Sequence, residues 1–371
     1  MGKIRLATIG TSAIGERLLE AAAEVDALEY VGTFSRDEEK AAWFTERHGG
    51  TRPFASLDGL CACDDVDAVY VASPNAAHFA QALACVEAGK HVLVEKPLCA
   101  NRNQAERLLA AADRRHVVAL EAMRPVHDPA WGIVTAALDR ILPLHRATLR
   151  FGKYSSRYDD LLAGRRTNIF DARLATGALM DIGIYCAESM CALFGSPDHV
   201  ASVATLVGEA GSALTGGAID GAGSALCTFD GDDQDGSLVV ELAWSKVTQD
   251  LLPCQFEGER GTLTVDSVST PAHATLRLRG KPVRGGLTAA SSQGDVVEEL
   301  ALEPCANTMV HELRDFCSLI RGEEIDTMWG ERLQAADALA RFCDVSLAAL
   351  DVTDEVRRQA GIAFPADEQE G

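Results

Sequence analysis

Short apolar segments alternate with amphipathic segments along the first 122 residues, and this alternation constrains the fold more than any other feature. The apolar segments are too short for helices and are typical of buried strands, whereas the segments between them have helical periodicity. Strands that alternate with helices form a doubly wound parallel sheet, with helices on both faces. The predicted strands are residues 4–9, 28–34, 67–72, 91–95 and 117–121, with a weaker strand and a helix between residues 47 and 61.

The first strand leads into a glycine-containing turn, Gly10 to Gly15, and then into a helix that ends near Val25. Strand, turn and helix are the context of a dinucleotide-binding fingerprint, in which the helix N-terminus offers unpaired N–H groups to a pyrophosphate. We expect Gly10 to form the tight turn and Gly15 to allow close packing of helix on strand. The middle glycine of the pattern is Ser12 here. The residues of this turn predicted to contact the cofactor are Gly10, Thr11, Ser12, Ala13 and Ile14.

The second strand ends at Ser35 and Arg36, about twenty residues beyond Gly15, where NAD-binding proteins place an acidic residue on the ribose 2′-hydroxyl. A guanidinium group instead suits a 2′-phosphate, because it can donate two parallel hydrogen bonds to it. Ser35 and Arg36 therefore predict NADP in preference to NAD. The alternative is an ordinary arginine at a strand end, before a helix that begins at Asp37.

Polar residues also follow the later strands of the predicted sheet. Ligands of open α/β sheets bind just outside the carboxyl ends of the strands, so these residues should lie along the same edge as Gly10. Lys96 is the candidate reactive group among them, and the alternative is a surface lysine at a strand end. The predicted cofactor contacts at this edge are Ser73, Pro74, Asn75, His78, Glu95, Lys96 and Glu121.

The sequence pattern changes after Pro125, which predicts a dinucleotide-binding domain over residues 1–122 and a second α/β domain over residues 123–371. Period-two alternation predicts a large open, mostly antiparallel sheet, whose exposed face indicates a homodimer or homotetramer. Of two closing helices, about 308–320 and 329–350, we expect the last to pack back on the first domain. The predicted strands are residues 145–151, 200–207, 223–229, 237–247, 254–265 and 275–279.

A helix predicted from Gly177 to Phe194 carries Asp181 and Tyr185 four residues apart, so their side chains share one face. An acid and a phenol at this spacing can serve catalysis. They can equally be a capped helix start and a core tyrosine, and the residues alone leave both interpretations open.

The composition argues against several classes of partner. A formal net charge of −21 disfavours nucleic acid and anionic membranes, which bind clustered Lys and Arg. The apolar runs are far shorter than the ~18 residues of a membrane span, and no signal-peptide pattern is seen, so we expect a cytoplasmic protein. The 11 cysteines show no zinc-site spacing, so no metal is expected and most should be small buried side chains.

Together these motifs resemble the Gfo/Idh/MocA family of NAD(P)-dependent oxidoreductases over nearly the whole chain. The resemblance implies a Rossmann domain, a second domain with a large open sheet, and a cleft between them where cofactor and small-molecule substrate meet. It also implies that Lys96, Asp181 and Tyr185 are catalytic. It rests on Gly10 to Gly15, Ser73-Pro74-Asn75 with His78, Glu95-Lys96-Pro97, Glu121-Ala122-Met123, Gly177 to Tyr185, and Arg358 to Pro365.

Many family members have histidine where this chain has Tyr185. A tyrosine at this position resembles the glucose–fructose oxidoreductase and dihydrodiol dehydrogenase branches of the family. An inositol-type substrate is therefore less expected. The family's three glycines before this helix are Ala175, Thr176 and Gly177 here, a second departure that leaves the local backbone geometry open.

The activity implied by the resemblance is hydride transfer between nicotinamide and a CH–OH or C=O group of a sugar- or polyol-type substrate. The alternatives are a non-sugar substrate such as a dihydrodiol, and a non-catalytic regulator that senses the dinucleotide. We favour Tyr185 as proton donor and acceptor beside Lys96, although the two could exchange roles, and burial should lower the pKa of Lys96. The residues predicted to contact substrate are Arg124, Tyr154, Arg157 and Asn168.

Overall fold

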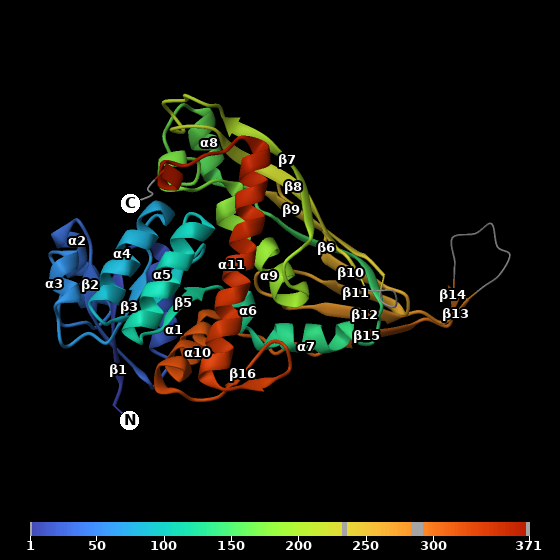
Figure 1. Ribbon diagram of the computed structural model, residues 1–371, viewed down its shortest axis with the longest axis horizontal. Coiled ribbons are helices and arrows are strands. Elements are labelled where there is room, and N and C mark those ends of the chain that lie inside the picture. Colours follow the sequence, from blue (N-terminus) through green and yellow to red (C-terminus); the bar gives the residue numbers. More distant parts are fainter. Residues whose placement is uncertain (1, 232–235, 283–291, 369–371) are drawn as a thin grey trace.

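The protein, seen in a computed structural model that describes residues 2–231, 236–282 and 292–368, contains two separate large sheets (Figure 1). Within the described residues the first sheet has five parallel strands in the order β2-β1-β3-β4-β5, which confirms the predicted doubly wound sheet. Its strands are β1 (Ile4–Ile9), β2 (Leu28–Phe34), β3 (Ala68–Val71), β4 (His91–Glu95) and β5 (Ala119–Ala122).

The weak strand predicted between residues 47 and 61 is wrong. This segment forms only an isolated bridge between Phe34 and Phe54 beside β2. Arg52 and Phe54, on either side of Pro53, donate to the carbonyl oxygens of Val31 and Thr33 at 3.0 and 2.9 Å, but no longer ladder forms.

Helices cover both faces of the first sheet. Alternate strand residues belong to different apolar cores, with Tyr70 and Leu93 on one side and Val69 and Val92 on the other. Several helices begin after a Ser, Asp or Asn residue whose side chain accepts an N–H of the first turn. The helices of this part are α1 (Ala13–Ala22), α2 (Glu38–Arg47), α3 (Leu57–Cys61), α4 (Asn75–Glu87) and α5 (Arg102–Arg115).

The second sheet confirms the prediction of a large, mostly antiparallel sheet. Among the described residues it has eight strands in the order β15-β12-β11-β10-β6-β9-β8-β7, and the pair β6 and β9 is parallel. The segment predicted as one strand, 254–265, is a hairpin that turns at Glu259 and Arg260. The strands are β6 (Leu144–Gly152), β7 (His199–Gly208), β8 (Ile219–Phe229), β9 (Leu238–Ser245), β10 (Cys254–Gly258), β11 (Gly261–Val265), β12 (Ala274–Leu278) and β15 (Val296–Leu300).

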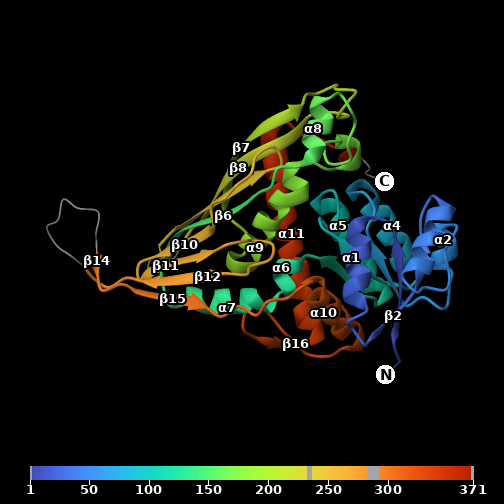
Figure 2. The ribbon, with the colours of Figure 1, turned by 180° about the vertical axis from the view of Figure 1, so that it is seen from behind.

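Helices lie on the inner face of the second sheet and leave its outer face uncovered (Figures 1 and 2). The helix predicted from Gly177 begins with a π turn, and residues 156–162 form a further helix. The helices are α6 (Arg124–His127), α7 (Pro129–Leu138), α8 (Ser156–Leu162), η1 (Ala172–Leu174), η2 (Leu179–Gly183), α9 (Ile184–Phe194), α10 (Met309–Arg321), α11 (Ala335–Ala360) and η3 (Pro365–Glu368). Short strand pairs are β13 (Lys281–Pro282) with β14 (Ser292–Gln293), and β16 (Ile325–Asp326) with β17 (Arg332–Leu333).

The long helix α11 lies between the two sheets (Figure 1). Its Leu350 belongs to an apolar core of the first sheet, and its Val356 belongs to the core shared with the second. The predicted bounds, 329–350, are wrong at both ends. Gly330 lies in the turn of the short pair β16–β17, which precedes the helix, and the helix continues to the left-handed Gly361.

One helical segment, Ala172–Phe194, is long and apolar enough to cross a membrane by length and composition. Its apolar window is 83% buried inside the protein, packed between α11 and the second sheet. An apolar helix enclosed in this way is typical of the core of a globular protein.

Candidate active site

A continuous cleft follows the carboxyl edge of the first sheet. It consists of an inner cavity of about 430 Å³, which includes Lys96, and an outer cavity of about 420 Å³, which includes Arg36. The edge thus brings together residues that follow different strands, as the topology predicts. The residues that line both cavities are Ser12, Ala72, Ser73, Pro74 and Asn168.

The turn after β1 is shaped to accept a phosphate group. Gly10 has φ 104°, and a Cβ atom there would lie 2.7 Å from the carbonyl oxygen of Ala72, so only glycine fits. Ser12 replaces the motif's middle glycine and caps α1, its hydroxyl accepting the N–H of Gly15 at 3.5 Å. The reason predicted for Gly15 is wrong, because a Cβ atom there would make only ordinary contacts, the nearest at 3.6 Å.

The other residues of this turn take different positions. Thr11 lines the outer cavity and Ile14 lines the inner one. Ala13 is exposed as the first residue of α1 and does not line either cavity. The turn therefore contributes residues to both cavities of the cleft.

The outer cavity carries more positive charge than the sequence analysis anticipated. Ser35 and Arg36 line it as predicted, and Lys40 from α2 lines it as well. Asp37 caps α2 by accepting the N–H of Lys40 at 3.1 Å and pairs with its ammonium group at 3.5 Å. Two cations beside one carboxylate favour a doubly charged phosphate over a hydroxyl group.

Two lysines surround one aspartate at the wall of the inner cavity, which Lys96 and Asp181 line and Lys246 does not. Lys96 Nζ donates to the backbone carbonyl oxygen of Asp181 at 2.5 Å and to its Oδ1 at 3.0 Å. The second carboxylate oxygen, Oδ2, accepts from Lys246 Nζ at 2.5 Å. Lys246 is not among the predicted site residues, because only the fold brings the end of β9 next to Asp181.

These contacts fix the charges of the cluster. Burial raises the pKa of Asp181, but the attraction of Lys96 and Lys246 is stronger and holds that pKa well below its usual value. Burial lowers the pKa of Lys96, but Asp181, Tyr185 and Glu95 outweigh it, so the pKa of Lys96 is raised. The predicted lowering is therefore wrong, and Lys96 is an ammonium ion at neutral pH.

Tyr185 lies beside this cluster, on the first turn of α9. Its ring centroid is 5.2 Å from Lys96 Nζ, and its hydroxyl accepts from Arg124 Nη2 at 3.3 Å. Phe151 packs edge-on against the ring at 5.6 Å. Arg124, predicted to contact substrate, does not line either cavity and is directed at the tyrosine instead.

The segment that carries Lys96 is held from behind by two buried carboxyl groups. Glu95 accepts from the hydroxyl of Tyr70 and, at 3.2 Å, from the N–H of Lys96. Glu121 accepts the N–H of Leu98 at 2.8 Å. Burial raises the pKa of both groups, and that of Glu121 to about 7. Glu95 lines the inner cavity, whereas Glu121 does not.

The predicted residues His78 and Asn75 connect separate loops at the cavity. His78 is fully buried, and its two ring nitrogens lie 2.9 Å from the carbonyl oxygens of Ser73 and Pro97. Asn75 Nδ2 donates to the carbonyl oxygen of Ala175 at 2.8 Å. Ala175 has φ 52°, a conformation that glycine adopts more readily. Both residues therefore join loops that carry the cleft.

The helix start that carries Asp181 is anchored to the second sheet. Asp220 accepts the N–H of Leu179 and the indole N–H of Trp244, both at 2.8 Å. Gly177, the glycine retained before this helix, has φ 123°, and a Cβ atom there would lie 2.4 Å from Asp220 Oδ1. The π turn η2 follows directly, and such turns are frequent at functional sites.

The remaining substrate candidates separate into two groups. Asn168 lines both cavities. Tyr154 and Arg157 line neither, because Tyr154 donates to Asp159 at 2.6 Å and Arg157 pairs with Asp160 at 3.5 Å around α8. The structure therefore brings only Asn168 of these three to the cleft.

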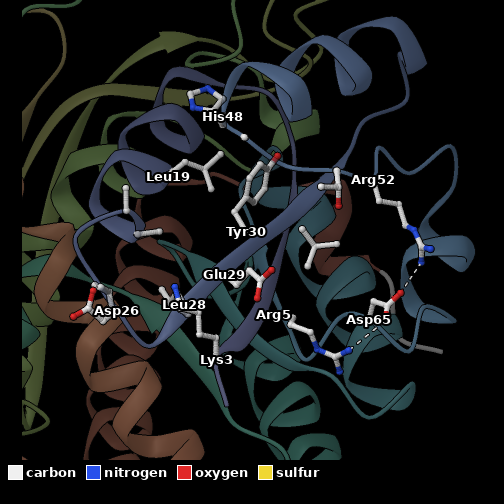
Figure 3. Close-up of a pocket in the computed structure, with 16 residues that line it drawn as sticks. Lys3, Arg5, Leu19, Asp26, Leu28, Glu29, Tyr30, His48, Arg52 and Asp65 are labelled. Atoms are coloured by element: carbon white, nitrogen blue, oxygen red, sulfur yellow. Dashed lines mark hydrogen bonds and ion pairs between the residues drawn. The ribbon is translucent and has the colours of Figure 1, made fainter. Parts of the chain in front are cut away.

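A third cavity, of about 540 Å³, lies at the other end of β1 and β2 and includes none of the predicted residues (Figure 3). Arg5 pairs with Asp67 at 2.6 Å and with Asp65 at 3.4 Å, and Arg52 also pairs with Asp65, at 3.3 Å. Because these cations are paired with the protein's own carboxylates, the cavity is poorly suited to an anionic cofactor.

Comparison with known proteins identifies the family. The model of an oxidoreductase family with an NAD-binding Rossmann fold, Gfo/Idh/MocA, matches residues 4–122. Scyllo-inositol 2-dehydrogenase (NADP(+)) IolU from Bacillus subtilis (strain 168) is 33% identical over 365 residues, which cover 98% of this chain and 99% of that protein. The uncharacterized oxidoreductase YgjR from Escherichia coli (strain K12) is 30% identical over 98% of each chain.

The crystal structure of KijD10, a 3-ketoreductase from Actinomadura kijaniata in complex with NADP and TDP-benzene, is similar over both sheets. It has a TM-score of 0.75 at 26% identity and covers 97% of this chain and 98% of its own. The likeness therefore extends well beyond the Rossmann segment. The chain belongs to the Gfo/Idh/MocA family of NAD(P)-dependent oxidoreductases.

Proposed function

We propose that this enzyme is an NADP-preferring dehydrogenase or reductase of the cytoplasm that interconverts CH–OH and C=O groups of a sugar- or polyol-type substrate. The observation that carries this proposal is the meeting of Lys96, Asp181 and Tyr185 in a cavity that continues into the dinucleotide cleft. Relatives named as an inositol dehydrogenase and a 3-ketoreductase support a ring alcohol or ketone as the reacting group. The similarity to an inositol dehydrogenase gives no support to the prediction that Tyr185 disfavours inositol-type substrates.

The cleft fits NADP in its shape and in its charge. Gly10 leaves open the space that a Cβ atom would fill, and the N-terminus of α1 faces the same turn. Arg36 and Lys40 would hold the 2′-phosphate in the outer cavity. When bound, the nicotinamide supplies or accepts the hydride.

Lys96 is arranged to bind the reacting oxygen of the substrate. Its ammonium group has three donors and spends two of them on Asp181, which leaves one N–H for the substrate. A positive charge fixed at this point stabilises negative charge that develops on a carbonyl oxygen. Asp181 keeps this ammonium group ionised and oriented.

Tyr185 is the group we assign to proton exchange, with Lys96 as the alternative. Arg124 donates to the tyrosine hydroxyl at 3.3 Å and Lys96 lies over the ring, so the phenol is held between two cations beside the cavity. In the reductive direction Tyr185 would release its proton to the substrate oxygen. In the oxidative direction the oxyanion would take it back.

A substrate panel tests this proposal. Inositols, other polyols, sugars and dihydrodiols are incubated with NADP, or their ketones with NADPH, and nicotinamide absorbance is followed. We expect turnover of a polyol or sugar. Turnover of dihydrodiols alone would favour a non-sugar substrate, and tight NADP binding without any turnover would favour a dinucleotide-sensing regulator.

We also propose that the chain divides into two domains near residue 122. We infer a homodimer or homotetramer formed through the outer face of the second sheet. Val203 is 74% exposed and Leu226 is 50% exposed on adjacent strands of that face. Light scattering should give a dimer or larger for the parent and a smaller species for Leu226→Asp. A monomeric parent at micromolar concentration would refute the inference.

A further inference from the structure

Lys246 is a buried cation that reaches the active site from the second sheet. It follows β9 directly, and its side chain is only 11% exposed. Its backbone is fixed on both sides, because its N–H donates to Gly221 at 2.8 Å and its carbonyl oxygen accepts from Ser155 at 2.9 Å. Its ammonium group donates to Asp181 Oδ2 at 2.5 Å, and it does not line the inner cavity itself.

The two lysines divide the carboxylate of Asp181 between them. Oδ1 faces Lys96 at 3.0 Å and Oδ2 faces Lys246 at 2.5 Å, so each oxygen has a cation of its own. Two ammonium ions beside one carboxylate leave one unit of positive charge in the cluster. An Asp181–Lys96 pair without Lys246 would be neutral.

The surrounding charges do not cancel this excess. Glu95 is a further carboxyl group near Lys96, and its negative charge is offset by the guanidinium of Arg124, which acts on it. The same guanidinium lies beside Tyr185. The neighbouring His78 is fully buried, and burial lowers its pKa.

We propose that Lys246 is a positioning residue, which occupies the outer oxygen of Asp181 so that Lys96 keeps one N–H, and the cluster keeps its net positive charge, for the substrate oxygen. This inference rests on the proposed function. Without Lys246 the carboxylate is free to rotate and accept from Lys96 with both oxygens. The carboxylate would then offset the charge of Lys96 and hold its ammonium group, still protonated, away from the substrate.

The expected kinetic effect follows from this indirect role. Lys246→Met should lower kcat roughly tenfold to a hundredfold, at or below the lower end of the ~10²–10⁴-fold typical of a direct acid or base. KM for NADP should not change, because Lys246 does not line either cavity. Lys246→Arg keeps the charge and a donor to Oδ2 and should restore much of kcat. The matched control is Lys153→Met. Lys153 is exposed, and its backbone N–H donates to the carbonyl oxygen of Ser245.

A double-mutant cycle separates this role from a general structural one. If Lys246 acts through Asp181, then Lys246→Met should have no further effect on kcat once Asp181→Asn is in place. Additive losses in the double variant, or a normal kcat in Lys246→Met, would overturn the proposal. NADP affinity and thermal unfolding of each variant show whether the fold is retained.

Failure of the proposed function gives a different result. A parent enzyme that turns over none of the panel refutes the proposed function, and the reactivity of Lys96 then decides the present inference. Competitive labelling with an amine reagent, read by mass spectrometry, should modify Lys96 more slowly in Lys246→Met than in the parent. Equal or faster labelling would overturn the assignment.

Discussion

Replacing Lys96 with methionine tests the proposed chemistry most directly, because methionine keeps most of the side chain's length and removes its charge. The variant loses the two hydrogen bonds to Asp181, at 2.5 and 3.0 Å, together with the donor left for the substrate. Groups that supply a proton or stabilise charge in the transition state typically contribute ~10²–10⁴-fold in rate. We therefore expect turnover to fall by at least about a hundredfold, or roughly 3 kcal/mol in activation free energy.

The same variant should remain folded, and the structure gives the reason. Removing one partner of an isolated buried ion pair costs about 3–5 kcal/mol, because a charge is left unpaired. Here Asp181 keeps Lys246 at 2.5 Å, so its carboxylate still has a cation, and the loss of unfolding free energy should be smaller. The pKa of Asp181 is held well below its usual range, so this difference should not vary with pH near neutrality.

The assay compares kcat, NADP affinity and thermal unfolding in the parent, in Lys96→Met and in the exposed control Lys153→Met. A low kcat with normal NADP affinity and a retained fold is the expected result. Near-normal turnover in Lys96→Met would refute the assignment of the lysine to the reacting oxygen.

Three further predictions concern the cofactor turn, cofactor choice and pH. Arg36→Ala should weaken NADP binding about tenfold to a hundredfold, the size of a charged hydrogen bond, and leave NAD binding unchanged in fluorescence titrations; unchanged NADP preference would count against Arg36. Gly10→Ala places a Cβ atom 2.7 Å from a carbonyl oxygen at φ 104°, so it should lose NADP binding and about 1–3 kcal/mol of unfolding free energy, whereas normal binding would contradict the cradle. The pKa of buried Glu121 is raised from 4.5 to about 7, so the unfolded chain releases this proton first and stability falls as pH rises from 4.5 through about 7. The free energy of unfolding, measured with urea at pH 5 and pH 8, should therefore fall less in Glu121→Gln than in the parent, by a difference of the order of a few kcal/mol. An unchanged pH dependence in this variant would exclude Glu121 as the cause of the fall.

The first sheet and the cofactor turn could be predicted because their signals are local. Gly10 follows an apolar strand and precedes a helix, and Lys96 follows another strand, so the topology places both at one edge. The weak strand prediction was wrong because the segment around Pro53 makes only a few hydrogen bonds to β2 and a single bridge, too little for a strand. The hairpin of β10 and β11 was predicted as a single strand, because the short turn at Glu259 does not interrupt the alternation of apolar and polar residues on either side.

The contacts of the site depend on pairs that the sequence does not connect. Lys246 lies 65 positions from Asp181, and its distance to that carboxylate is decided by how β9 is placed beside η2. Arg124 was assigned to the substrate because polar residues near a cleft often bind one, yet α6 directs it at Tyr185. The pKa of Lys96 was predicted in the wrong direction because burial was foreseen and the strength of its pairing was not.

The shared helix α11 has a consequence for how this chain can be divided. Leu350 completes an apolar core of the first sheet, and Asp354 accepts the N–H of Arg102 at 2.9 Å, although both lie more than 200 residues after β5. A fragment that ends at residue 122 would therefore expose a core that its own sequence cannot close. We therefore expect that the dinucleotide-binding part does not fold as an independent module, and that exchange of modules between relatives has to transfer the C-terminal helix together with the first 122 residues.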